Sequence, residues 1–205
     1  MQAKQLLFAC AAALVLVSCS KNSSYRTEPR RNVKSHSTSV ARTNIYSGGN
    51  VTAVTYCGEP DTTLLLAGQT IPVGYVISGN DGSNTYVTYV CTNGWSMEEV
   101  HLFYGEATIT GIPLRVNYNF IGMPVNNSGN PVLGQFPVVQ TFSNHPTSYT
   151  VAIPEALPMT YEMPLAAHAV VTNGSQSETA WGQGEPVTLQ GSWAMYFWYV
   201  SSVCE

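Results

Sequence analysis

The sequence predicts an all-β protein, an antiparallel β-sandwich that contains a long irregular insertion and follows a disordered tether. Three observations lead to this prediction. Only 10% of the 205 residues are charged, while valine, threonine, tyrosine and glycine are plentiful, a composition typical of β-rich domains. Short runs of β-branched and aromatic residues alternate with turns rich in glycine, asparagine and proline, and no segment keeps a 3.6-residue apolar period. Short strands joined by such turns are the pattern of a sandwich.

The chain begins with a segment that has the proportions of an export signal. Lys4 makes its start positive, and residues 6–17 form an apolar run without charge. This run is shorter than the ~20 residues that a membrane-spanning helix needs. Residues 1–18 are therefore interpreted as a signal peptide that is removed from the mature protein.

The predicted signal peptide ends at the sequence Leu16-Val17-Ser18-Cys19. These four residues resemble the lipobox of bacterial lipoproteins. The resemblance implies cleavage before Cys19, lipidation of its sulfur and acylation of its amino group. Two or more acyl chains hold a protein stably at a membrane. The alternative is ordinary secretion, with Cys19 buried in the folded protein.

Residues 19–50 are predicted to be a flexible basic tether that leads to a folded domain at 51–205. The tether carries six basic residues and one acidic residue, and it has too little apolar surface to order itself. Its bases would lie near anionic lipid groups, or the segment is simply a solvated linker. The domain carries eleven acidic residues and one basic residue, Arg115. This balance excludes nucleic-acid binding, which requires a basic face.

Alternation and turn signals predict the strands in the first half of the domain. These strands are expected at 63–67, 71–78, 85–92 and 99–104, with tight turns at 80–83 and 93–94. The last three are expected to pair in sequence order as an antiparallel meander.

The second half of the domain begins with the predicted insertion. Residues 105–146 contain five prolines and several glycines, so they are expected to be irregular, with one short strand at 114–120. Further strands are predicted at 147–153, 166–172 and 192–200.

Three cysteines remain beyond the predicted anchor: Cys57, Cys91 and Cys204. Export permits a disulfide, and the chain ends of a sandwich often lie close together. Cys57 and Cys204 are therefore the expected pair, with Cys91 buried in a strand. The sequence contains no Cys-x-x-Cys pair and no histidine–cysteine cluster with metal-ligand spacing, so neither a metal nor another cofactor is predicted.

Two strand histidines are the candidates for acid–base chemistry. His101 follows Glu98 and Glu99, and His168 lies in an Ala-Ala-His-Ala-Val-Val run. A histidine and a carboxylate can act together as acid and base, but a strand histidine between small residues is more often a hydrogen-bonded core group. Because no nucleophile elbow is present either, no catalytic residue is assigned.

Ligand binding is predicted at two tryptophans. Trp95 follows a turn, and Trp181 lies in a stretch with glycines that is interpreted as a loop. An exposed indole presents an apolar face on which a sugar ring can stack, and the neighbouring Glu178 and Gln183 would hydrogen-bond to hydroxyl groups. The alternative is that both tryptophans fold back and plug the ends of the sandwich.

Five stretches of the domain form a joint pattern: Gly94-Trp95, 99–105, 167–169, 178–184 and 192–197. Together they resemble an extracellular β-sandwich module of secreted and lipid-anchored proteins from Bacteroidota-type bacteria. The resemblance covers about residues 64–200 and implies a small outer-membrane lipoprotein without implying any catalytic residue. Lys21 follows the anchor without the acidic residues that often mark surface export in such lipoproteins, so a surface-exposed and a periplasm-facing position both stay open.

Three functions fit these observations. The first is a non-enzymatic lipoprotein of the cell envelope, which is anchored in the outer membrane and binds a glycan or another envelope protein. The second is a hydrolase of envelope or dietary polysaccharides, because paired catalytic carboxylates need no fixed spacing in the sequence. The third is a structural surface component that assembles through strand edges.

Overall fold

The computed structural model describes residues 42–47, 50–110, 117–154, 162–188 and 191–205. The predicted signal peptide, the predicted lipidation site Cys19 and the first part of the predicted tether lie outside these residues. The described residues all belong to one compact unit, Ser37–Glu205. Within them, no helix has the length and apolar character needed to cross a membrane.

The described chain is built from short strands that pair in the antiparallel direction. The predicted all-β, antiparallel fold is therefore confirmed. The strands are β1 (Arg42–Ser47), β2 (Asn50–Thr55), β3 (Asp61–Ala67), β4 (Ile71–Asn80), β5 (Thr85–Cys91), β6 (Ser96–Tyr104), β7 (Glu106–Thr110), β8 (Asn117–Ile121), β9 (Val138–Thr141), β10 (Ser148–Ile153), β11 (Glu162–Thr172), β12 (Ser177–Gly182), β13 (Glu185–Pro186) and β14 (Met195–Val200). A short 3-10 turn, η1 (Leu133–Gln135), precedes β9.

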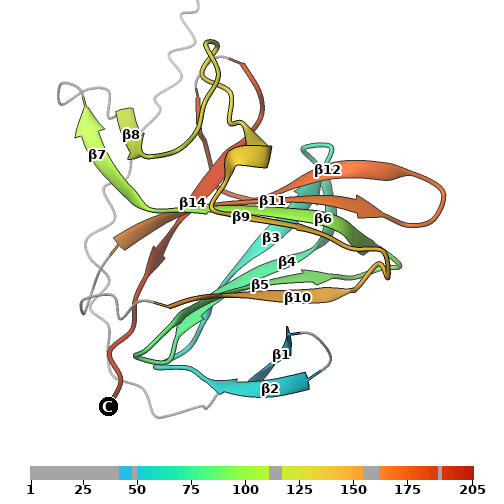
Figure 1. Ribbon diagram of the computed structural model, residues 1–205, viewed down its shortest axis with the longest axis vertical. Helices are drawn as coiled ribbons and strands as arrows, with labels where there is room; N and C mark the ends of the chain where they lie inside the picture. Colours follow the sequence, from blue (N-terminus) through green and yellow to red (C-terminus); the bar gives the residue numbers. More distant parts are fainter. Residues whose placement is uncertain (1–41, 48–49, 111–116, 155–161, 189–190) are drawn as a thin grey trace, which may run out of the picture. The chain divides into compact units, whose positions relative to one another are not determined.

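The main sheet curves so that its strands form two facing layers (Figure 1). Strands β10, β5, β4 and β3 are neighbours in one layer, and strands β12, β11, β6 and β9 are neighbours in the other. The layers are continuous along one side because β3 pairs with β12. Strand β14 pairs with the first residues of β11, and β13 pairs with β14.

Side-chain alternation along these strands produces the core between the layers. Successive residues of a strand point to opposite faces, so Val100 and Leu102 of β6 and Ala167 of β11 all point inward. The core also contains Tyr89 of β5, which is fully buried. Its hydroxyl donates to the backbone carbonyl of His101 on β6 at 2.9 Å, and this hydrogen bond ties one layer to the other.

A second apolar cluster covers the outer face of β6, β11 and β12. Its members come from these strands, from the segment before β9 and from the region of β14: Phe103, Met123, Phe136, Ala166, Trp181, Ala194 and Tyr196. The predicted insertion at 105–146 thus has a packing role. It contains β7, β8, η1 and β9, and β8 overlaps the short strand that is predicted at 114–120.

One predicted strand pairing is wrong. Strand β6 does not continue a meander beside β5 but crosses to the other layer, where it pairs with β11 and β9. The edge of β5 that it was expected to use is occupied by β10. Both faces of β6 carry buried apolar residues, Val100 in the core and Phe103 in the second cluster. A strand of this kind is stable where both of its faces are covered.

The stretch that is interpreted as a loop around Trp181 is instead strand β12. Gly182 of this strand allows a close contact with β14 and does not form a turn. A Cβ atom on Gly182 would lie 2.8 Å from Cε1 of Phe197, so only glycine lets β14 pack its ring against this strand.

Strand pairing begins before the predicted domain boundary. Strand β1 lies inside the range 19–50 that is assigned to the tether, and it pairs along its whole length with β2. The β-branched residues Val51, Thr52, Val54 and Thr55 favour a strand here.

The C-terminal end of the domain is tied to the turn after β4. Cys57 and Cys204 form a disulfide, which is the predicted pair, and Cys91 is free and buried. The side chain of Asn80 donates to the carbonyl of Ser202 at 3.0 Å and accepts from its N–H at 2.8 Å. Asn80 also accepts from the Tyr199 hydroxyl at 2.7 Å. These bonds hold the end of β14 in place beside β4.

Candidate functional site

Both predicted ligand-binding tryptophans are buried, which corrects their proposed stacking role. Trp181 is 5% exposed and Trp95 is 7% exposed. Trp95 belongs to the core between the layers, whereas Trp181 belongs to the second cluster. Neither ring offers a face to a sugar, so the structure favours the packing alternative for both. The physical reason for Trp181 is that the second cluster covers its face of β12.

The two polar residues predicted beside Trp181 do not form a site with it. Glu178 and Trp181 are three positions apart in β12, so their side chains point to opposite faces. Gln183 is exposed just beyond β12, and its backbone N–H donates to the carbonyl of Leu64 at 2.7 Å. This hydrogen bond extends the pairing of β12 with β3 by one residue.

The structure brings the two candidate histidines together in what we call the His cluster: Glu99, His101, His168 and Trp181. His101 of β6 and His168 of β11 are directly opposite in the strand register, and their Nδ1 atoms are 3.2 Å apart. The Nε2 atom of His101 lies 3.2 Å from Oε1 of Glu99. Trp181 is opposite His168 on the next strand, and the two rings meet edge to face with their centroids 4.8 Å apart.

The hydrogen bonds of the His cluster fit one arrangement of protons. A carboxylate only accepts hydrogen bonds, so we assign the proton of His101 to Nε2, which donates to Glu99. The neutral ring of His101 then has a lone pair on Nδ1, and the Nδ1–H of His168 donates to it. Burial, followed by the charge of a protonated His101, lowers the pKa of His168 to about 3. Burial also lowers the pKa of His101, although Glu99 opposes this shift.

The two histidines of the His cluster are closed to substrates, whereas the Glu99 side chain is partly exposed. His168 is 1% exposed, and the rings of the second cluster cover this face of the sheet. A general acid or base must come within hydrogen-bonding distance of the proton that it transfers. Among the described residues there is also no group of three side chains that could hold a metal ion. The arrangement therefore favours the core role of the two histidines over catalysis.

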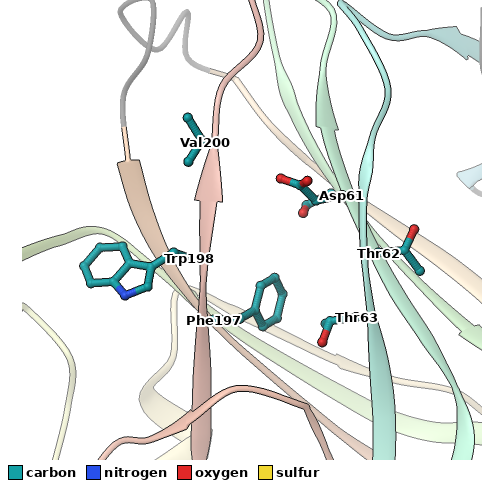
Figure 2. Close-up of a pocket in the computed structure, with 7 residues that line it drawn as sticks. Asp61, Thr62, Thr63, Phe197, Trp198 and Val200 are labelled. Atoms are coloured by element: carbon teal, nitrogen blue, oxygen red, sulfur yellow. The ribbon is translucent and has the colours of Figure 1, made fainter. Parts of the chain in front are cut away.

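A pocket lies where the sheet divides between β3 and β14. The pairing of β3 with β12 covers Leu65, Leu66 and Ala67, and the earlier residues of β3 face β14 across an opening (Figure 2). This opening has a volume of about 390 Å³. It is lined by Asp61, Thr62, Thr63, Ser78, Phe197, Trp198 and Val200. We call it the β3–β14 pocket.

Three polar side chains share one face of the pocket wall. Asp61 of β3 and Ser78 of β4 are cross-strand partners, and Thr63 lies two positions after Asp61, so all three point to the same side. Figure 2 shows Asp61, Thr63 and the ring of Phe197 directed into the opening. Thr62 points away from it, and the indole of Trp198 lies on the other side of β14.

Asp61 is the charged residue of this pocket. Partial burial raises the pKa of its carboxyl group, and the backbone N–H of Val200, which donates to the carboxylate, opposes part of that rise. Burial disfavours the charged form of a carboxyl group, and no basic residue lines the pocket to oppose this effect. The Asp61 residue as a whole remains exposed to solvent, which weakens the field of its carboxylate.

Ser78 adds an unsatisfied hydroxyl group to the same wall. Its side chain is 0% exposed, and its Oγ has no hydrogen-bond partner within the part of the chain that the structure describes. Leaving a buried hydroxyl without a partner costs roughly 1–3 kcal/mol. The neighbouring hydroxyl of Thr63 donates to the carbonyl of Gln183 at 2.8 Å and keeps its lone pairs available. Because the Ser78 hydroxyl is closed to solvent, the acceptors that a ligand could reach are the Asp61 carboxylate and the Thr63 hydroxyl.

Sequence reasoning did not find the β3–β14 pocket. Asp61 and Phe197 lie at opposite ends of the domain, and no spacing in the sequence connects them. One signal could have indicated it. In β3 the inward face carries Leu65 and Ala67 in the core, and alternation places Asp61 and Thr63 on that same face. Polar residues that continue an apolar face mark the place where a core opens to ligand or solvent.

Comparisons of the chain with protein-family models, with curated proteins and with solved structures find no match. The interpretation of the site therefore depends on its geometry and chemistry.

Proposed function

We propose that the protein is a non-enzymatic lipoprotein of the cell envelope and that its all-β domain binds a glycan in the β3–β14 pocket. The observation that carries this proposal is the lining of that pocket. An aromatic ring, Phe197, and two hydrogen-bonding side chains, Asp61 and Thr63, converge on one opening. Sugars present apolar ring faces and polar hydroxyl edges, so they match a site of mixed character better than a purely apolar ligand does.

The size of the pocket supports a small ligand or a single residue of a longer chain. Its volume of about 390 Å³ is near the lower end of the 300–1,000 Å³ that is roughly usual for ligand sites. It opens between two strands, so a polymer could place one sugar inside and continue into solvent. Against a hydrolase, the histidine of the one His–carboxylate pair among the described residues, His101 with Glu99, is buried.

The sequence supports the location in the envelope. The Leu16-Val17-Ser18-Cys19 run resembles a lipobox, and lipidation of Cys19 would place the domain at the outer membrane, facing either the surface or the periplasm. The basic residues of 19–50 would then lie near anionic lipid groups. Envelope glycans would be within reach of a domain held there.

Replacing Cys19 with alanine tests the anchor. We expect the full chain with Cys19→Ala to leave the membrane fraction, because the sulfur that carries the lipid is lost and a single acyl chain binds only marginally. Cys91→Ala is the matched control, since that thiol is buried in β5 and free. Retention of Cys19→Ala in membranes after a carbonate wash would show that the anchor is not lipid on this cysteine.

A glycan array tests the binding site. We expect the full chain to bind a subset of glycans and Phe197→Ala to lose that binding by about tenfold or more, because stacking on the ring contributes on the order of 1 kcal/mol beyond its buried area. Tyr75→Ala is the control, since Tyr75 is an aromatic residue of β4 that is 42% exposed outside the pocket. Unchanged binding by Phe197→Ala would move the site elsewhere, and binding to no glycan would refute the proposed function.

A further inference from the structure

We infer that the outer face of strands β3, β4 and β5 is a membrane-facing surface, which rests on lipid when the chain is anchored. This inference rests on the lipid anchor of the proposed function and adds the orientation in which the domain is held. It comes from the side chains of this face, from their lack of charge and from the place where the described chain begins.

A row of apolar side chains crosses the outer face of these three strands. Leu64 of β3 is opposite Tyr75 of β4, and Tyr75 is opposite Val90 of β5. A neighbour of each residue along its strand belongs to the core, so this row points outward. Ile77 lies two positions after Tyr75 and extends the row on the same face. Tyr75 is 42% exposed and the other three are half-buried; we call these four residues the outer apolar patch.

The face around the outer apolar patch carries no charge. Strands β4 and β5 contain no charged residue, and Asp61, the one charged residue of β3, is directed into the β3–β14 pocket (Figure 2). The remaining outward positions of the three strands are Thr62, Leu66, Pro72, Gly79, Tyr86 and Thr88. A face of this kind can approach lipid without taking an ion out of water.

Charge also separates this face from the rest of the domain. From Val51 to Glu205 the sequence has one basic residue against eleven acidic residues. The negative surface potential of anionic lipids repels acidic groups, so the domain approaches such a membrane most easily through a side without acids. The tyrosine of the patch suits this position, because its ring is apolar and its hydroxyl is polar, and such side chains are enriched at membrane–water interfaces.

The described chain begins beside the same outer face. A Cβ atom on Gly79 would lie 2.6 Å from Cδ1 of Tyr56, so the lack of a side chain there lets the Tyr56 ring rest on the sheet. The same ring meets Tyr86, the outward partner of Gly79, edge to face with the centroids 6.1 Å apart. Val54 of β2 belongs to this contact, and β1 pairs with β2 and lies near β10 (Figure 1).

This starting point connects the face to the proposed anchor. Residues 20–41 join Cys19 to β1, and they contain most of the basic residues of the chain. Attraction of these bases to anionic lipid groups would draw the start of the domain towards the membrane. A tether also keeps the domain at a high effective concentration near the lipid, so a weak contact through the outer apolar patch is enough to orient it.

The size of the patch favours lipid over a second copy of the chain. A stable protein–protein interface takes roughly 20–30 residues from each partner, and the outer apolar patch is far smaller. A lipid surface has no fixed shape to match, and the acyl chains of the anchor supply the affinity. The contact through the patch then only has to choose which side of the domain faces the membrane.

Site-specific fluorescence on the lipidated full chain in vesicles tests this inference. The vesicles contain phosphatidylethanolamine and phosphatidylglycerol, with or without a lipid that carries a quencher in its acyl chain. An environment-sensitive dye is attached to Tyr75→Cys and, as the matched control, to Thr141→Cys, an exposed position of β9 in the other layer. Cys91 is buried and the Cys57 and Cys204 sulfurs are joined, so the introduced thiol is the one that reacts. We expect quenching at position 75 to be several-fold stronger than at position 141.

One further variant connects the quenching to the lack of charge. Thr62 is exposed on the outer face, opposite Ile77. Thr62→Glu in the chain labelled at position 75 should reduce the quenching towards the control level, because a carboxylate loses hydration at the lipid surface. Thr62→Gln has nearly the same shape without the charge and should keep the quenching. A melting curve for each variant shows that the fold is intact.

The outcomes separate this inference from the function on which it rests. If the chain does not sediment with vesicles, the anchor and the membrane-facing surface are both refuted. If it sediments but positions 75 and 141 are quenched equally, or if Thr62→Glu changes nothing, the membrane-facing surface is refuted while the anchor stands. If the dye at position 75 is already shielded without vesicles and the chain sediments as a dimer, a second copy covers the patch and the inference is refuted. Strong quenching at position 75 supports it even where the glycan array is blank.

Discussion

Two regions of this domain place buried polar side chains beside more exposed carboxylates, and they do so in opposite ways. In the His cluster, Glu99, His101 and His168 form a chain in which each donor meets an acceptor, and Trp181 packs against its end. In the β3–β14 pocket, Asp61 has a backbone N–H as its partner and Ser78 has none among the described residues. The first region is closed by the second apolar cluster, whereas the second opens between two strands.

This difference shows why burial alone is a poor guide to function. By sequence, the histidines are the better candidates for chemistry, because histidine and carboxylate are the common acid–base pair. In the structure their hydrogen bonds are already made inside the protein, so they contribute to the uniqueness of the packing. The carboxylate of Asp61 carries hydrogen-bonding capacity that the protein does not use. An unsatisfied group beside an opening indicates a ligand more directly than a satisfied pair in a core.

The largest expected effect that separates the two regions comes from their aromatic rings. Trp181→Ala should lower the free energy of unfolding by roughly 3–5 kcal/mol, as expected for a buried tryptophan, because it removes the ring that packs on His168 and within the second cluster. It should not change glycan affinity. Chemical denaturation measures the loss, and the glycan array at a temperature well below melting measures the binding.

Phe197→Ala is the matched variant in the other region. Phe197 is partly buried and lines the pocket, so its loss should cost less stability than that of Trp181 while abolishing most of the binding. A Trp181→Ala variant that is as stable as the wild type but does not bind glycan would contradict this assignment of the two regions. That result would return Trp181 to the ligand site that the sequence predicts.

The elements of the two regions also differ in how well they can be predicted from the sequence. Strands such as β5 and β10 follow from β-branched and aromatic alternation, and the disulfide between Cys57 and Cys204 follows from the expectation that chain ends meet. Strand β12 was missed because Gly182 reads as a loop residue. Gly182 is instead required by the close approach of the Phe197 ring, which belongs to a different strand, β14, and this contact is not visible in the local sequence.

The pairing of strands explains the rest of what sequence could not show. Two tight turns predict that β6 pairs with β5 in a meander. In the structure, β10 pairs with that edge of β5 instead. Which of the two strands pairs there depends on the packing of the whole domain and not on the turns alone. That crossing is what places His101 opposite His168. The pocket likewise exists because β14 follows β11 while β3 follows β12 and β4. The spacing of residues along the sequence does not determine which strands become neighbours.

The second expected effect is a pH dependence of stability that comes from the His cluster. In the folded protein the pKa of His168 is lowered from 6.5 to about 3, so between these values the unfolded chain binds a proton that the folded chain does not. Stability is therefore fully present above about pH 6.5 and is lost as the pH falls towards 3, by about 1.4 kcal/mol per pH unit for one such group. Burial lowers the pKa of His101 as well, which adds to the loss in the same direction.

Urea unfolding of three proteins between pH 7 and about pH 4 isolates this contribution. The wild type and His145→Asn, which changes an exposed histidine, should lose stability along parallel curves. His168→Gln should be less stable at pH 7 but should lose less on acidification, because it has no proton to take up in the unfolded state. If all three curves run parallel, the His cluster does not titrate on unfolding and its rings are not held neutral by burial.

The smallest expected effect concerns two buried hydroxyl groups, and it tests the comparison most directly. Ser78 and Thr88 are both 0% exposed, but Thr88 shares a 2.8 Å hydrogen bond with the hydroxyl of Thr150. Thr88→Val leaves Thr150 unpartnered and should cost roughly 1–3 kcal/mol. Ser78→Ala removes a group that has no partner among the described residues, so the relief of its desolvation offsets the small void, and the free energy of unfolding should change by less than about 1 kcal/mol. A large loss of stability in ligand-free Ser78→Ala would mean that this hydroxyl is already satisfied in the free protein, and the two regions would then differ in access to solvent but not in unused hydrogen-bonding capacity.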